Sequence, residues 1–156
     1  MTTIPRSVVA AALAVSEDSL PPGDLPLDRF AERHAGWLAT PDEQREAHAD
    51  LWTFDLMVAL VKDHPDLAFA AVQATLDRCT TPDQVANLAA GPMEDLIRFH
   101  GAALIDVITT AAAEPRFRYL LSGVWQGDTP ALLWARIEAA RRGGPALDDG
   151  DPLPPR

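Results

Sequence analysis

Prolines lie between successive segments of this sequence in which apolar residues recur at regular spacing. Thr40-Pro41-Asp42-Glu43 and Thr81-Pro82-Asp83-Gln84 each place a hydroxyl before a proline and an acid or amide two residues after it. This order is typical of a capping box, in which threonine is the N-cap, proline fits the first helical position and the third helical residue reaches back to the cap. Four further prolines indicate helix starts: Pro65, Pro92, Pro115 and Pro130.

Apolar residues between these prolines recur at helical spacing and predict an all-α fold of about seven or eight helices. The expected helices cover residues 7–19, 25–38, 41–63, 65–79, 82–90, 92–113, 115–124 and 130–142. A composition of only 6% aromatic residues also suits packed helices better than a sheet. The helix over 41–63 is expected to break near Ala47, and the apolar segment Leu51–Val61 predicts a central core helix.

The order of prolines in the first half of the chain recurs about 50 residues later. Two arrangements fit this pattern: a compact helical bundle, or a short stack of helical hairpins. We expect one domain over residues 1–142, in which residues 1–24 form an arm or a helix. The segment 143–156 combines proline, glycine and acids with little to bury, which predicts a disordered acidic tail.

The N-terminal segment PRSVVAAALAVSEDS has a short apolar run after Arg6 and resembles a signal peptide in part. A signal peptide has a more strongly basic start, so an N-terminal helix or arm is the expected structure. No segment approaches the ~20 apolar residues of a membrane span. Cys79 follows Val72 and Leu76 at helical spacing, which favours a buried thiol in a reducing compartment. These features together predict a cytoplasmic protein.

The formal charge is -10, from 23 acids and 13 bases. This excess disfavours the phosphate contacts of a nucleic-acid-binding protein and favours a protein partner with a basic surface. Neither a nucleic acid nor a membrane is therefore an expected partner. The sequence does not indicate an oligomeric state.

The stretch 89–101, AAGPMEDLIRFHG, brings acids and a histidine together between two glycines. Gly91 suits the left-handed residue that ends one helix, and Pro92 the start of the next. His100 falls on the apolar stripe of the second helix, which favours a structural histidine over a catalytic one. Asp55 lies in the apolar segment noted above and is the candidate partner of His100. A pocket formed by Asp55 and His100 is the functional alternative.

Several segments of this sequence together resemble a family of small bacterial proteins known only as a domain of unknown function. The segments are AAGPMEDL, the His100-Gly101 pair, Glu114-Pro115-Arg116-Phe117 and Gly123-Val124-Trp125. The resemblance covers residues 50–130, and Glu114 stands where the family pattern has aspartate. It implies an all-helical domain without an established activity. It transfers no catalytic residue to this chain.

No cofactor or metal is expected. The four histidines lack the i, i+4 pairing of a helical zinc site, and one cysteine cannot form a Cys pair. The chain also has no glycine-rich phosphate loop after a strand and no Gly-x-Ser-x-Gly motif. Trp125 lies near a helix end, where packing against the last helix is favoured over contact with a partner.

We therefore expect a non-catalytic protein-binding module of the immunity, inhibitor or adaptor type that uses an acidic helical surface. Glu43, Glu46 and Asp50 would share one face of a continuous helix and, with Trp125, are the candidate binding residues. The alternative is a helical enzyme or small-ligand binder with its pocket around Asp55 and His100. The absence of a catalytic motif favours the binding module.

Overall fold

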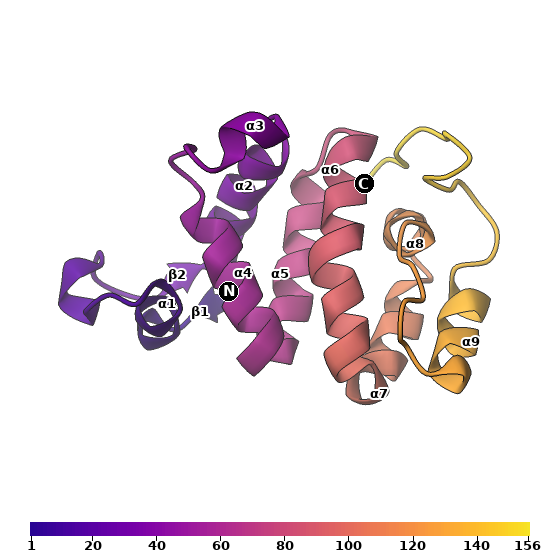
Figure 1. Cartoon of the computed structure of the whole chain (residues 1–156), viewed down its shortest axis with the longest axis horizontal. Coiled ribbons are helices and arrows are strands. Elements are labelled where there is room, and N and C mark those ends of the chain that lie inside the picture. Colours follow the sequence, from indigo (N-terminus) through magenta and orange to yellow (C-terminus); the bar gives the residue numbers. More distant parts are fainter. The chain divides into compact units, whose positions relative to one another are not determined.

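The computed structural model describes every residue from Met1 to Arg156, and it confirms the all-α fold class (Figure 1). The chain divides into two compact units, whereas the sequence predicts one domain over residues 1–142. The N-terminal unit comprises Met1–Arg78, and the C-terminal unit comprises Cys79–Arg156. Each has its own buried core. None of the helices combines the length and the apolar character needed to cross a membrane.

The N-terminal unit consists of a short two-stranded ribbon and a group of packed helices. Its elements are β1 (Thr3–Ile4), α1 (Arg6–Leu13), η1 (Glu17–Ser19), β2 (Leu25–Pro26), α2 (Leu27–Leu38), α3 (Asp42–Arg45), α4 (Trp52–Asp63) and α5 (Pro65–Arg78). The two strands are antiparallel, with Thr3 opposite Pro26 and Ile4 opposite Leu25. Helix α2 packs against α4 and α5, and α1 packs against α4. The expected N-terminal arm or helix is thus a strand followed by a helix.

Helix α4 is buried along one side only. Leu56 and Leu60 are fully buried, whereas Phe54, Asp55 and Val58 are exposed. The predicted core helix is confirmed in that α1, α2 and α5 all pack against it, although its outer side carries the apolar residues Phe54 and Val58 exposed. Apolar character alone does not place a residue in the core, because much of a folded protein's surface is also apolar.

The predicted break near Ala47 is confirmed, because α3 ends at Arg45 and α4 begins at Trp52. The capping box predicted at Thr40 is wrong. The Thr40 hydroxyl donates to the Gly36 carbonyl at 3.1 Å, and α3 has no side-chain cap. The Arg45 guanidinium donates to the carbonyls of Leu38 and Thr40 at 3.0 and 2.9 Å. Thr40 and Arg45 therefore satisfy carbonyl groups at the end of α2, which would otherwise lack donors.

The C-terminal unit comprises α6 (Pro82–Leu88), the π-helical turn η2 (Ala89–Met93), α7 (Glu94–Ala111), α8 (Pro115–Ser122) and α9 (Ala131–Ala140). The capping box at Thr81 is confirmed, with Gln84 bonded back to the cap. Helix α7 packs against α9, and α8 packs against α6 and η2. Cys79 is buried as predicted.

Gly91 and Pro92 lie inside a continuous helical run and do not end one helix and start another. Gly91 is absent from the residues with a positive φ, so the predicted left-handed helix end is wrong. Proline in a regular α-helix removes one hydrogen bond and crowds the carbonyl four residues earlier. A π-helical turn relocates the hydrogen bonds by one residue. The chain thus passes from α6 to α7 without a break.

The tail after Gly143 runs back past α8 (Figure 1), whereas its composition predicts disorder. The Tyr119 hydroxyl donates to the Asp151 carbonyl at 2.8 Å, and Arg116 Nη1 donates to the Pro154 carbonyl at 2.6 Å. The backbone N–H of Leu147 donates to the Ser122 hydroxyl at 2.9 Å. Polar side chains of α8 therefore hold a segment that has few apolar side chains of its own to bury.

Candidate functional site

The segment after α8 carries the most exposed aromatic side chain of the C-terminal unit, and charged residues hold its backbone. Arg141 Nη1 donates to the carbonyls of Leu121 and Val124 at 3.2 and 2.8 Å. The Arg141 guanidinium also stacks over the Trp134 ring, 4.8 Å from its centroid, and pairs with Glu138. Arg141 thus bonds to carbonyls at the C-terminus of α8, where a cation is favourable.

A carboxylate from α7 holds the other side of the same peptide group. Glu94 Oε1 accepts a hydrogen bond from the Trp125 backbone N–H at 2.8 Å. The Val124 carbonyl and the Trp125 N–H belong to one planar peptide unit, so an anion and a cation fix the plane from opposite edges. The Val124 side chain is buried. The backbone position of Trp125 is therefore fixed by interactions from α7 and α9.

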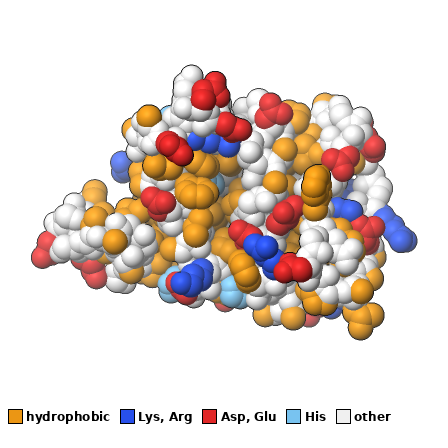
Figure 2. All heavy atoms as spheres, in the orientation of Figure 1, with side chains coloured by type: hydrophobic (Ala, Val, Ile, Leu, Met, Phe, Trp, Pro, Cys, Tyr) orange, Lys and Arg blue, Asp and Glu red, His pale blue; other side chains and the backbone are white.

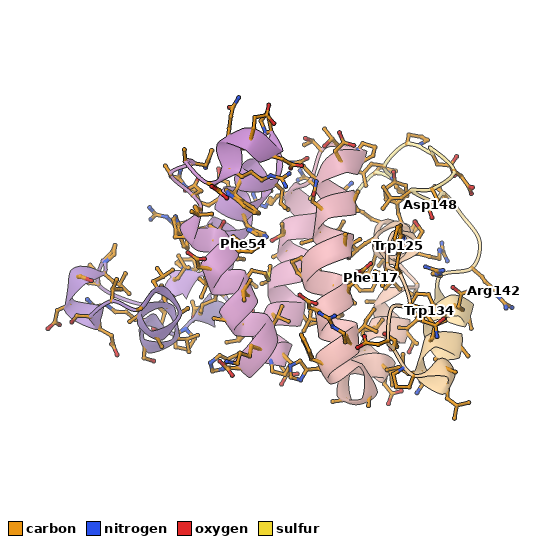
Figure 3. All side chains as sticks on the ribbon, viewed as in Figure 1. Phe54, Phe117, Trp125, Trp134, Arg142 and Asp148 are labelled. Carbon is orange, nitrogen blue, oxygen red and sulfur yellow. The ribbon has the colours of Figure 1, made fainter.

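The Trp125 side chain itself is 74% exposed. Figure 3 shows it over α8 on the viewer's side of the C-terminal unit. The sequence favoured packing of this tryptophan against the last helix, and that interpretation is wrong. The ring that stacks with Arg141 of the last helix is Trp134.

Helix α7 carries further charged and aromatic side chains in the turn that follows Glu94. Asp95 and Arg98 form an ion pair, and the Arg98 guanidinium lies 4.7 Å from the centroid of the Phe99 ring. Phe99 is 61% exposed. Asp95 lies one turn before both Arg98 and Phe99, and Glu94 lies one turn before Arg98. We call Glu94, Asp95, Arg98, Phe99 and Trp125 the Trp125 patch. Figure 2 shows acidic, basic and hydrophobic side chains mixed on this face of the protein.

The other candidate binding residues do not share a helix face. Glu43 lies in α3, Glu46 follows its end and Asp50 lies in the turn before α4. Asp50 is half-buried, and its carboxylate lies 3.9 Å from the Arg33 guanidinium. The common face required a continuous helix, and the break after Arg45 removes it.

Asp55 and His100 lie in different units and form no site within either one. Asp55 is exposed on α4. His100 is half-buried on α7, and its Nε2 atom is buried without a hydrogen-bond partner. Next to it, a side chain at Gly101 would meet Leu133 of α9 at 2.7 Å, so the glycine allows α9 to approach α7 closely there.

Sequence reasoning missed His34, which is the fully buried histidine of the chain. Its ring stacks between Phe30 and Trp37, with centroid distances of 5.4 and 5.7 Å. These residues follow one another at i, i+4 and i+7 along α2. This spacing in the sequence could have indicated that the three rings stack on one face of the helix. Burial lowers the pKa of His34 from 6.5 to about 4, because the charged ring would lose its hydration.

Hydrogen bonds determine which nitrogen of His34 carries the proton. The Thr53 hydroxyl donates to the Asp50 carbonyl at 2.7 Å, so it accepts from His34 Nδ1, which lies 3.0 Å away. Nδ1 therefore carries the proton, and the Nε2 lone pair is buried without a donor. A neutral, enclosed ring of this kind packs the core and is unsuited to proton transfer with a substrate.

No group of three or more His, Cys, Asp or Glu side chains in the structure is arranged to hold a metal ion. The hydroxyl of Tyr119 has a raised pKa, chiefly because it is buried and also because the Asp151 carboxylate is near. This group bonds to the tail and contributes to packing. Among the candidate sites described above, the Trp125 patch is therefore the one that combines a fixed backbone with exposed side chains that a partner could contact.

No curated protein and no solved structure matches the chain. A protein family described as a family of unknown function (DUF6869) matches residues 40–144. The match includes every residue of the Trp125 patch and all of α3 to α9. It extends over more than half of the chain, so this protein belongs to the DUF6869 family of unknown function.

Proposed function

We propose that this protein is a non-catalytic binding module that contacts another protein through the Trp125 patch. The observation that carries the proposal is an exposed indole on a peptide group held by Arg141 and Glu94. An inhibitor, an immunity protein or an adaptor would use such a surface. The partner is expected to offer an apolar pocket for the indole.

Tryptophan is the residue type most suited to this role, because it adds a large rigid surface at a small cost in side-chain entropy. Burying roughly 150 Å² of indole at about 25 cal/mol per Å² would contribute about 4 kcal/mol to binding. The fixed backbone reduces the entropy lost when the loop docks. Trp125 is thus suited to be the central anchor, with Phe99 at the edge of the contact.

Charge supports a basic partner. Glu94 bonds to the Trp125 backbone and Asp95 follows it on α7. Asp128 is exposed three residues after Trp125, and the whole chain carries a formal charge of -10. Such a field speeds encounter with a basic protein and opposes encounter with nucleic acid. Glu43, Glu46 and Asp50 contribute to this negative electrostatic potential. They do not form a separate docking surface, because they do not share a helix face.

The enzyme alternative has less support. It required Asp55 and His100 in a common pocket, yet Asp55 is exposed and the two belong to different units. His34 is the ring with the strongly lowered pKa, and it is enclosed by Phe30 and Trp37. The proposal therefore contains no catalytic step and no cofactor.

Photo-crosslinking tests this proposal even while the partner is unidentified. A benzophenone amino acid replaces Trp125 in one variant and Leu132 in the control, since Leu132 is 86% exposed on α9 and lies outside the patch. Irradiation in extracts of the source organism should yield a discrete protein adduct from position 125 alone. Equal adducts from both positions, or none from position 125, would contradict the proposed surface.

A further inference from the structure

The N-terminal unit contains a cavity of about 540 Å³ that the proposed function does not use. It lies between α1, the loop before β2, the start of α2 and the first residue of α4. Its lining residues are Arg6, Val9, Leu13, Leu20, Pro21, Pro22, Gly23, Asp24, Leu25, Pro26, Arg29 and Trp52. All except Trp52 precede the residues that match the family. The cavity therefore lies almost entirely outside the residues that match the family.

The loop that forms one wall is held in place by hydrogen bonds. Asp24 Oδ1 accepts from the Arg6 backbone N–H at 3.0 Å, and its Oδ2 lies 3.5 Å from the Thr3 hydroxyl. Gly23 has a φ of +87°, a conformation that L side chains rarely adopt, and this lets the chain turn back after Pro21 and Pro22. The cavity wall is thus formed without a ligand, as in most small-molecule sites.

Two guanidinium groups and one carboxylate line a cavity whose other side chains are apolar. Arg6 Nη2 donates to the Leu20 carbonyl at 2.8 Å, while its Nε is buried without an acceptor. Arg29 is exposed and forms neither a hydrogen bond nor an ion pair. Asp24 is the one acid of the lining, and it is bonded to the backbone of α1. The lining therefore carries an excess of positive charge within a protein of formal charge -10.

We propose that this cavity binds a small amphipathic carboxylate, a molecule with one carboxylate group and an apolar body. A carboxylate can accept two parallel hydrogen bonds from an arginine, and Arg29 has no competing partner. Arg6 adds a second positive charge to the lining. The side chains of Val9, Leu13 and Trp52 supply the apolar surface for the body of the ligand. The cavity volume lies in the range of about 300–1,000 Å³ found for such sites.

Calorimetric titration of the full chain with decanoate tests the site, and decanol and decyltrimethylammonium test the requirement for negative charge. Decanoate should bind with a dissociation constant of about 100 µM or lower. Decanol should bind at least about tenfold more weakly, because it lacks the charged head that arginine recognises. The cationic analogue should give no binding. Equal binding of decanoate and decanol, or no binding of decanoate, would overturn the proposal.

Arg29→Gln identifies the recognition residue, and Arg33→Gln is its matched control. Arg33 lies one turn further along α2 and does not line the cavity. Arg29→Gln should weaken decanoate binding about tenfold, and Arg33→Gln should leave it within about twofold. Both arginines are exposed, so the variants should retain the helical circular dichroism spectrum. Equal affinities of the two variants for decanoate would show that Arg29 does not bind the carboxylate.

Discussion

The buried ring of His34 should make the protein sensitive to acid below neutral pH. Its environment contains two aromatic rings and one hydroxyl, and no acid lies in position to stabilise a charged imidazole. Burial lowers the pKa of His34 from 6.5 to about 4 in the folded protein. The unfolded chain therefore takes up a proton at a higher pH than the folded chain does.

The sign and size of the effect follow from this difference. The stability that depends on neutral His34 is fully present above pH 6.5 and is lost as the pH falls toward 4, where the folded state also becomes protonated. Each pKa unit corresponds to about 1.4 kcal/mol, so acidification from pH 7.5 to 4 should cost about 3 kcal/mol. That loss is a large part of the stability of a typical domain.

Urea unfolding of the wild type and His34→Phe at several pH values isolates this effect. The phenylalanine variant keeps an aromatic ring in the stack and cannot be protonated. Its stability at pH 7.5 will differ from that of the wild type because the Thr53 contact is lost. Between pH 7.5 and 4, however, the wild type should lose about 3 kcal/mol more than the variant, since all other titrating groups are shared. Parallel pH profiles would refute the reasoning, as would a His34 proton resonance that titrates near pH 6.5.

Other parts of the structure give further predictions. Thr81→Ala should lower the free energy of unfolding by about 1 kcal/mol, because it removes the capping box. Thr40→Ala should cost less, because Thr40 caps no helix N-terminus and loses only an exposed hydrogen bond to the Gly36 carbonyl; urea unfolding distinguishes the two variants. Arg116→Met should cost about 2–4 kcal/mol, since its buried guanidinium donates to two backbone carbonyls, and an unchanged melting temperature would contradict this role. Absorbance titration of Tyr119, the single tyrosine, should give a pKa above 10.0. Asp151→Asn should lower that pKa and leave it above 10.0, because burial is the larger cause; a value at or below 10.0 in the wild type would show that the ring is not buried.

Local sequence signals predicted most helices because capping and apolar spacing act over a few residues. The limit of such signals is visible in the two Thr-Pro motifs. Thr81 precedes a helix whose Gln84 can reach back to it. Thr40 has the same local pattern, yet its hydroxyl bonds backward to Gly36 in the helix that is ending. The motif alone does not specify which of two adjacent helices the hydroxyl will serve.

The candidate surface was less predictable because it depends on residues distant in sequence. Trp125 was a candidate, but nothing in its own loop showed that Glu94 and Arg141 would bond to its peptide group from two other helices. The stripe containing Phe30, His34 and Trp37 was visible at helical spacing, whereas the burial of its histidine required the position of Thr53 on α4. Contacts between helices depend on tertiary packing, and a short segment of the sequence does not specify which distant segment it will contact.

The measurement that most directly tests the central claim is the affinity of the crosslinked partner for Trp125→Ala. Calorimetry with the purified partner should show a loss of about 30-fold or more relative to the wild type, as expected for an anchor residue worth about 2 kcal/mol or more. Leu132→Ala removes a side chain that is even more exposed and should change the affinity less than about threefold. A partner that binds Trp125→Ala and the wild type with equal affinity would contradict the account.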